Sequence, residues 1–250
     1  MVTISHNAKQ QLLKAARPIR LIFGFRIRWL SRRLYAGRFF GHSGLDQKLL
    51  NVIDPTPSYY VEIGANDGVD QSNTLALELF HGWEGLLIEP SSTTFKKLRR
   101  NRSNRRNYLF KSACVSSTFP DDRVVLLYSN LMSIAVGLHS DVPDPHAHAE
   151  SGTKYLSSKD SLRTESVPAT TLTRALQMAG APSRIGLLSL DVEGAELEVL
   201  EGIDFGKYSF DWMLIESRDV ARIASYLKIH GYAIREKMSH HDYLFSQRRD

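Results

Sequence analysis

Apolar and polar positions alternate in a regular rhythm along the chain from about residue 58 onward. Short apolar runs rich in branched and aromatic residues are each followed by a longer stretch whose apolar residues recur every three or four positions. The first pattern predicts buried strands, at 58–64, 85–89 and 107–114. The second predicts amphipathic helices, at 70–81 and 91–103. Such alternation is typical of an α/β, doubly wound and mostly parallel sheet with helices on both faces.

The rhythm breaks after the strand expected at 124–129. Residues 130–165 lack a steady period and include the Pro- and His-containing HSDVPDPHAHAESG, which predicts an irregular insertion acting as a lid over a site. The alternation then resumes. We expect helices at 171–180, 194–201 and 219–230, strands at 184–192 and 210–217, and an antiparallel C-terminal hairpin formed by YAIREK and HDYLFSQ.

The N-terminal segment differs from the rest of the chain in charge. Residues 1–45 contain nine Lys and Arg residues and no acid before Asp46. Removing those nine charges from the overall +5 leaves −4 for the remainder, so an anionic partner is expected for this arm alone. Pro18 suits the first turn of a helix that runs to about Tyr35. The sequence is therefore divided into a basic helical N-terminal arm, 1–57, and an α/β domain, 58–250.

Two hypotheses remain open for residues 16–37, where arginines are interleaved with apolar residues. The segment is either a helix packed on the sheet or on a second subunit of a homo-oligomer, or an interfacial helix that contacts an anionic membrane. Nucleic acid is a weaker third partner, because the body of the protein is acidic. No apolar run approaches the roughly 20 residues of a spanning helix, so we interpret the protein as cytoplasmic or peripheral at the inner face of the membrane.

Composition excludes some classes of site. Apolar content of 42% and charged content of 24% are those of a soluble globular protein. The only cysteine is Cys114, so neither an intrachain disulfide nor a four-cysteine zinc site can form.

A glycine turn follows the first expected strand, in the sequence YVEIGANDGVDQSNTLALELF. It reads E-x-G-x-N-x-G, and neither the dinucleotide fingerprint nor the phosphate-binding lysine loop is present. Glu62 and Asp67 would repel a pyrophosphate, whereas a carboxylate at Glu62 suits a cationic amine. Asn66 stands where a glycine is common, and Asn tolerates a left-handed backbone.

Glu89 ends the next strand, 21 positions after Gly68. Open α/β sheets place at this point an acid that accepts hydrogen bonds from ribose hydroxyls. An adenosine with a cationic, amino-acid-like tail describes S-adenosylmethionine. The alternative is that Glu62 is a capping or solvated acid and Glu89 a surface residue.

A second motif, LLSLDVEGAELEVLEGID, places three acids at the end of a strand and the start of a helix. Ligands bind at the carboxyl ends of such strands, which makes Asp191 a candidate for the reaction centre. Helix capping and the helix dipole are sufficient to explain Glu196, and both explanations stay open for Glu193.

Together, VEIGANDG, LLIEP, LDVEGAELEVLEGI and HHDYLF resemble the FkbM-type methyltransferases, a branch of the class I S-adenosylmethionine-dependent enzymes, over about residues 58–247. The resemblance implies a seven-stranded sheet with an antiparallel last hairpin, and methyl transfer to a hydroxyl of a sugar, glycolipid or natural product. It also implies a set of cofactor-binding residues: Glu62, Gly64, Asn66, Asp67, Gly68, Glu89, Ser112 and Cys114. Where many relatives have Thr-Leu-Asp, this chain has Thr171-Leu172-Thr173.

The reaction needs a group that handles the proton of the acceptor hydroxyl. Candidates are Asp191, Glu216 and His241. Asp191, Glu193 and Glu216 could instead hold a divalent metal through their oxygens, although we favour transfer without a metal. Two other functions remain as alternatives: a catalytically degenerate methyltransferase fold that serves as a binding scaffold and, against the missing fingerprint, a nicotinamide-dependent oxidoreductase.

Overall fold

The computed structural model describes residues 38–248 of the 250-residue chain. The helix expected to end near Tyr35 and the basic segment 16–37 lie outside the described residues. Within the described part, no helix has the length and apolar character needed to cross a membrane.

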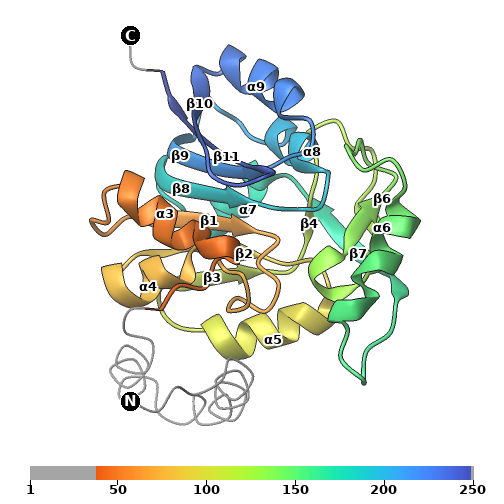
Figure 1. Ribbon diagram of the computed structural model, residues 1–250. Helices are drawn as coiled ribbons and strands as arrows, with labels where there is room; N and C mark the ends of the chain where they lie inside the picture. The colour runs from red at the N-terminus through yellow and green to blue at the C-terminus, as the bar shows by residue number, and fades with distance from the viewer. Residues whose placement is uncertain (1–37, 249–250) are drawn as a thin grey trace, which may run out of the picture.

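The centre of the molecule is a seven-stranded sheet in the order β3-β2-β1-β8-β9-β11-β10 (Figure 1). All neighbouring pairs are parallel except those that involve β11, which runs antiparallel to β9 and to β10. The predicted doubly wound sheet with an antiparallel C-terminal hairpin is thereby confirmed. Its strands are β1 (Tyr59–Ile63), β2 (Glu84–Ile88), β3 (Asn107–Phe110), β8 (Arg184–Leu190), β9 (Ser209–Glu216), β10 (Tyr232–Lys237) and β11 (Asp242–Gln247).

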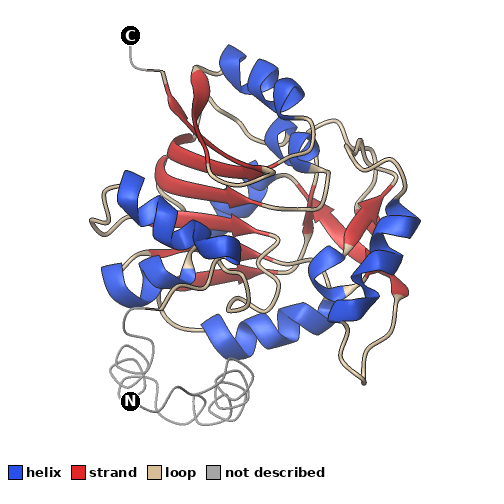
Figure 2. Ribbon diagram, viewed as in Figure 1, coloured by secondary structure: helices blue, strands red, loops and turns tan. Residues whose placement is uncertain are grey.

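Helices cover both faces of this sheet (Figure 2). One layer consists of α3 (Leu45–Val52), α4 (Leu75–His81) and α5 (Ser92–Arg102), and the other of α7 (Leu172–Ala179), α8 (Glu196–Glu201) and α9 (Val220–Ile229). Because successive residues of a strand point to opposite faces, Tyr60 packs under the first layer and Val61 under the second. Helix α3 falls within the arm of the sequence-based division, but Leu45 and Leu49 pack directly on the sheet.

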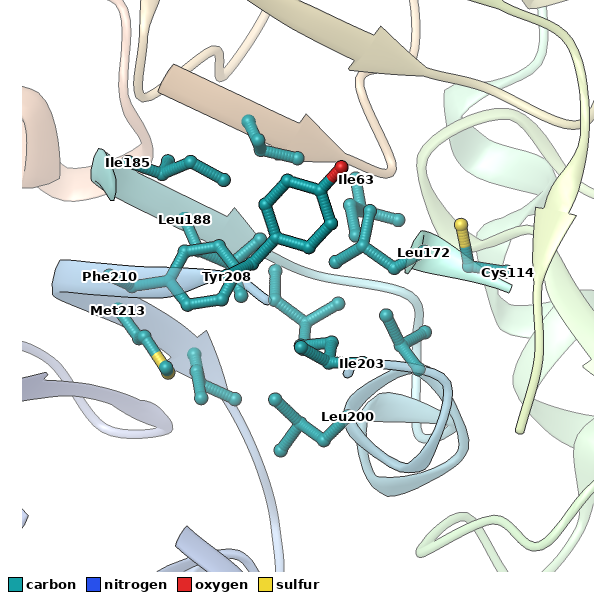
Figure 3. Packing of buried hydrophobic residues seen from close by; sticks show 14 of the residues in the cluster. Ile63, Cys114, Leu172, Ile185, Leu188, Leu200, Ile203, Tyr208, Phe210 and Met213 are labelled. Carbon is teal, nitrogen blue, oxygen red and sulfur yellow. The ribbon is translucent and has the colours of Figure 1, made fainter. Parts of the chain in front are cut away.

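A hydrophobic core lies on each face of the central sheet. The larger of the two joins the sheet to α7 and α8. Figure 3 shows Ile63, Leu188 and Met213, from three adjacent strands, packed with Leu172 and Leu200. Buried side chains of this size each contribute roughly 1.5–3 kcal/mol of transfer free energy. This packing fixes the positions at which β1, β8 and β9 end, and therefore the positions of the loops that follow them.

A second, four-stranded sheet lies beyond the carboxyl ends of the central strands (Figure 1). Its order is β4-β7-β5-β6, formed by β4 (Ala113–Cys114), β7 (Arg163–Thr170), β5 (Arg123–Tyr128) and β6 (Ile134–Val136). The expectation of a wholly irregular segment at 130–165 is therefore wrong. That range also contains α6 (Pro145–Ser151) and the 3-10 turns η3 (Asn130–Met132) and η4 (Gly152–Tyr155).

The strand pattern at β7 is weak, which explains why it escapes sequence analysis. Val167 is its only buried residue, and polar side chains occupy most of its other positions. Two further boundaries differ from expectation. The helix expected at 70–81 begins at Leu75, and the strand expected at 107–114 is interrupted between Phe110 and Ala113, where the chain passes from the central sheet to the second sheet.

Candidate active site

A cavity of about 320 Å³ opens where β1, β2, β8 and β9 end. The segment after β5, including Asn130 and Leu138, lines it together with His42 of the short turn η2 (His42–Gly44). Most of the predicted site residues line this one cavity: Glu62, Gly64, Asn66, Glu89, Ser112, Cys114, Asp191, Glu193 and Glu216. Asp67, Gly68 and His241 are not part of the lining among the described residues.

The glycine turn brings β1 against the loop after β8. Gly64 has a φ of 81°, and a Cβ at this position would lie 1.8 Å from the carbonyl oxygen of Asp191. No residue with a side chain fits there. Asn66 has a φ of 45°, which confirms that this asparagine adopts the left-handed conformation expected of it. Asp67 turns back within the loop, where its Oδ1 accepts hydrogen bonds from the backbone N–H groups of Val69 and Asp70 at 2.9 Å.

Glu62 is buried and its carboxylate shapes the loop before α4. It accepts hydrogen bonds from Ser72 Oγ at 2.9 Å, from the Asn73 N–H at 3.0 Å and from Thr74 Oγ1 at 2.7 Å. These bonds hold residues 70–74 out of the helix that the sequence predicts there. Glu62 thus stabilises the edge of the cavity that it also lines.

Arg102 of α5 is a buried cation behind the glycine turn, with a relative exposure of 1%. Its guanidinium donates to the Gly68 carbonyl oxygen at 2.9 Å and to the Tyr60 hydroxyl at 2.7 Å. It forms ion pairs with Glu78 at 2.5 Å and with Glu62 at 3.6 Å. Burial by itself lowers the pKa of Arg102, and the surrounding Glu78, Tyr60 and Glu62 outweigh that effect and hold it raised. Sequence analysis missed this residue because it lies in the basic run KKLRRNR, which resembles a solvated helix face.

Glu89 lies at the end of β2, where it links three parts of the cavity wall. One carboxylate oxygen accepts a hydrogen bond from the Asn66 N–H at 3.0 Å. The other accepts from the Ser91 N–H at 2.8 Å and from Thr94 Oγ1 at 2.6 Å. Burial raises the pKa of Glu89 to about 7, against these hydrogen bonds, which lower it.

An acidic cluster stands on the other side of the cavity. Oxygen atoms of Asp191, Glu193 and Glu216 all lie within 4.8 Å of one another. The Asp191 side chain is exposed toward the cavity. Desolvation by the surrounding protein, together with the charges of Glu216 and Glu193, raises the pKa of Asp191 well above its usual range. Carboxyl groups placed this closely can share a proton or a cation.

Glu196 belongs to the turn that presents this cluster. It is buried, and its Oε1 accepts from the N–H groups of Val192 at 3.0 Å and Gly194 at 3.1 Å. Burial raises its pKa to about 8. The geometry agrees with the capping explanation, because Glu196 satisfies backbone donors at the start of α8 and does not line the cavity.

The segment between β6 and α6 and the helix α6 are attached to the acidic cluster by charged residues that sequence analysis missed. Asp141 Oδ2 accepts hydrogen bonds from the N–H groups of Arg218 at 2.7 Å and Asp219 at 3.1 Å. Arg218 in turn approaches Glu193 at 3.4 Å. His148 Nε2 of α6 lies 3.0 Å from the same Glu193 carboxylate, in ion-pair range but without hydrogen-bond alignment.

The final hairpin contributes to the cavity through a residue other than the predicted histidine. The His241 ring nitrogen Nε2 contacts Nδ1 of His240 at 2.9 Å, and neither ring lines the cavity. Asp242, which pairs with Glu216 in the register of β11 and β9, does line it. The sequence signal that could have identified Asp242 is its place at the start of a strand adjacent to β9.

The strand order and the acidic loops at the strand ends define a fold of the class I methyltransferase type. The methyltransferase FkbM domain model matches residues 62–244, and the chain belongs to this family. Membership implies S-adenosylmethionine as the cofactor and confirms the resemblance inferred from the sequence motifs.

Solved structures of methyltransferases are similar to the chain at low sequence identity. A methyltransferase FkbM from Methylobacillus flagellatus is 14% identical with a TM-score of 0.44, and the match covers 76% of this chain but only 43% of that one. The human methyltransferase 10 domain containing protein is 14% identical with a TM-score of 0.45 and 98% coverage of both chains. A precorrin-6y C5,15-methyltransferase from Geobacter metallireducens is 8% identical with a TM-score of 0.41, covering 80% of this chain and 84% of that one. The comparison with curated proteins gives no match.

The cavity residues fit an adenosyl cofactor. Glu89 lies at the end of β2 with a carboxylate able to accept from ribose hydroxyls, and Gly64 leaves the turn beside it free of side-chain atoms. Ser112 and Cys114 line the neighbouring wall, with the apolar side chains of Leu126 and Leu138. The Cys114 thiol stays protonated, because burial raises its pKa to about 12.

We predict that the affinity for S-adenosylmethionine rises with pH up to about 7 and then levels off. The ionised form of Glu89 accepts hydrogen bonds from the ribose, and its pKa in the free protein is raised to about 7. Below that pH, binding must first remove a proton, so affinity falls by up to about tenfold for each pH unit. Isothermal titration calorimetry between pH 5.5 and 8.5 measures this dependence. Glu89→Gln should bind roughly thirtyfold to a hundredfold more weakly at pH 8 and lose the pH slope. An unchanged slope in this variant would remove Glu89 from the site.

Arg102→Gln should lower the free energy of unfolding by about 3–5 kcal/mol, because it leaves two buried carboxylates without their cation. Urea denaturation gives this value, and the exposed neighbour Arg105→Gln serves as the matched control, expected within about 0.5 kcal/mol of the parent. Arg102→Lys keeps the charge but not the planar set of guanidinium donors. Its free energy of unfolding should lie between those of the two glutamine variants, and it should bind cofactor more weakly than the parent. Equal stability of the two glutamine variants would contradict the role of Arg102.

Proposed function

We propose that the protein is an S-adenosylmethionine-dependent O-methyltransferase. One observation carries the proposal: the cofactor turn at Gly64, the ribose acid Glu89 and the acidic pair Asp191 and Glu216 all line a single cavity. The cofactor, when bound, supplies a methyl group on a positively charged sulfur. The protein must meet the other requirements. It must hold the acceptor oxygen in line with the methyl group, exclude water and take up the hydroxyl proton.

Asp191 is the residue best placed to act as the base. Its backbone carbonyl oxygen abuts Gly64, so its position relative to the cofactor turn is fixed by packing. Its carboxyl is accessible from the cavity and interacts with Glu216, which provides a second carboxyl for the proton. The raised pKa of Asp191 makes its carboxylate a stronger base than an aspartate with an ordinary pKa. His241 has less support, because its ring lies outside the cavity lining.

The charge of the cavity supports an acceptor without anionic groups. Acidic side chains dominate the lining near the reaction centre, and Arg218, whose charge is paired with Glu193 and Asp141, is the one arginine in it among the described residues. A phosphate or carboxylate placed beside Asp191 and Glu216 would be repelled. Hydroxyl groups of a sugar, glycolipid or natural product can instead donate hydrogen bonds to these carboxylates.

The insertion lines part of the cavity and is proposed to hold the acceptor. Asn130 and Tyr155 line the cavity, and Asn130 accepts a hydrogen bond from the Asn66 side chain at 3.4 Å. The insertion therefore contacts the cofactor turn as well as the loop after β9. Shortening it is expected to weaken the binding of both cofactor and acceptor, because the insertion contacts the cofactor turn and also lines the cavity.

The proposed function is tested by cofactor-binding titration, followed by methylation assays on glycans and lipid-linked sugars with labelled S-adenosylmethionine. With an acceptor in hand, Asp191→Asn should bind cofactor nearly as the parent does and lose about 10²–10⁴-fold in turnover, the usual contribution of a general base. Asp121→Asn, at an exposed position, is the matched control and should retain activity. Full activity of Asp191→Asn would show that another group takes the proton. Cofactor binding without turnover on any acceptor would favour a binding scaffold.

Turnover is expected to be independent of added metal. Arg218 already places a positive charge at Glu193, one of the three carboxylates that could bind a cation. Activity measured after treatment with EDTA and dialysis should equal that of untreated protein, and Mg²⁺ or Mn²⁺ should not increase it. Loss of activity on chelation, restored by either ion, would instead assign Asp191, Glu193 and Glu216 as metal ligands.

A further inference from the structure

A positively charged surface covers the outer side of α5 and the adjoining edge strand β3. Between residues 91 and 120 the chain has eight Lys and Arg residues and no acidic residue. Arg102 is the buried one, and the other seven are partly or fully exposed. We call these seven residues the basic face: Lys96, Lys97, Arg99, Arg100, Arg105, Arg106 and Lys111.

Little of this charge is neutralised within the protein. Lys97 approaches Asp160 at 3.8 Å, in a pair that is partly exposed. Over residues 38–248, no acidic side chain pairs with the other six members of the basic face. The like charges of the basic face repel one another. Contact with an anionic surface offsets this repulsion and lowers the electrostatic free energy. The basic face is therefore complementary to a polyanion.

The N-terminal arm enters the described structure on the same side. Gly41 forms a bridge with Gln71, in the loop that follows the glycine turn. The C-terminal end of α5 contacts that turn, where Asn101 donates to the Asp67 carbonyl oxygen at 2.7 Å. Residues 1–37 add eight Lys and Arg residues and no acid. The described part of the chain therefore begins near the same glycine turn that the C-terminal end of α5 contacts.

Aromatic side chains accompany these charges. Tyr108 on β3 is 38% exposed and Phe39 is 42% exposed. Basic residues combined with exposed aromatic residues are typical of surfaces that contact the headgroup region of a bilayer. A nucleic acid acceptor fits less well, because its phosphates would have to approach the acidic cluster around Asp191 to reach the site of methyl transfer.

We propose that the basic face of α5 and β3 docks the protein on an anionic lipid bilayer. Docking by electrostatic attraction is reversible and weakens with salt. The proposal concerns a surface outside the cavity and does not depend on the proposed methyl transfer. It is therefore tested with the protein alone, without cofactor or acceptor.

The test compares two triple variants of the full chain by co-sedimentation with vesicles of phosphatidylglycerol and phosphatidylcholine. The first, Lys96→Gln, Arg99→Gln and Arg100→Gln, neutralises exposed residues of the basic face. The second, Arg222→Gln, Lys228→Gln and Arg235→Gln, removes the same charge from exposed positions beside β10, at the opposite edge of the sheet. Each basic residue near an anionic surface contributes a similar amount of binding free energy. The first variant, which lacks three of these charges, should therefore bind roughly a hundredfold more weakly than the parent. The second should bind like the parent, and pure phosphatidylcholine vesicles should not bind any of the three.

Several results would overturn the proposal. An equal loss of vesicle binding in the two variants would mean that binding depends only on the net charge of the protein and that no particular face docks. Full binding by the first variant would assign attachment to another part of the chain. Absence of parental binding to anionic vesicles, with binding to single-stranded RNA that only the first variant loses, would identify the surface as a nucleic acid site. Thermal unfolding of each variant verifies that the fold is retained.

Discussion

The buried Arg102 is the interaction on which the shape of the cavity depends. Its guanidinium contacts the carbonyl oxygen of Gly68 and the carboxylates of Glu62 and Glu78. The charge of Glu62 would be costly in this buried position without a nearby cation, and Glu62 in turn holds the hydroxyls of Ser72 and Thr74. The loop 70–74 therefore stays non-helical along the cavity edge, and α4 begins only at Leu75. One cation from α5 thus maintains the turn that the cofactor is expected to contact.

A second constraint connects the two halves of the site. The absence of a side chain at Gly64 lets the backbone of the glycine turn lie against the carbonyl oxygen of Asp191. Glu89 and the acidic cluster consequently face one cavity, although Glu89 and Asp191 are 102 positions apart in sequence. Concentrating Asp191, Glu193 and Glu216 in this space is unfavourable by electrostatics, and Arg218 offsets part of that repulsion at Glu193. This electrostatic repulsion indicates a functional site, because the stability of the fold does not require three acidic residues at this position.

The second sheet adds a wall to the cavity at the ends of the central strands. The chain leaves the central sheet after β3, and β4, β5, β6 and β7 build a wall beyond the ends of the central strands. Asp141 connects the insertion to the loop after β9 through hydrogen bonds, and Asn130 contacts the glycine turn. The basic face lies outside this cavity, so docking on a surface and binding of an acceptor engage different parts of the molecule.

The sequence by itself determined the central sheet, the left-handed turn at Asn66 and the acids that end β1, β2 and β8. These features follow from local rules. Hydrophobic periodicity, the conformations of glycine and asparagine, and the ends of strands all depend on short segments of the amino-acid sequence. Tertiary structure alone decided which side chains meet. Arg102 reads as one of many basic residues on a helix, Asp141, His148 and Arg218 have no motif, and β7 has too few apolar residues to be seen. Their roles depend on burial and on charges brought from distant segments, which no local pattern in the chain records.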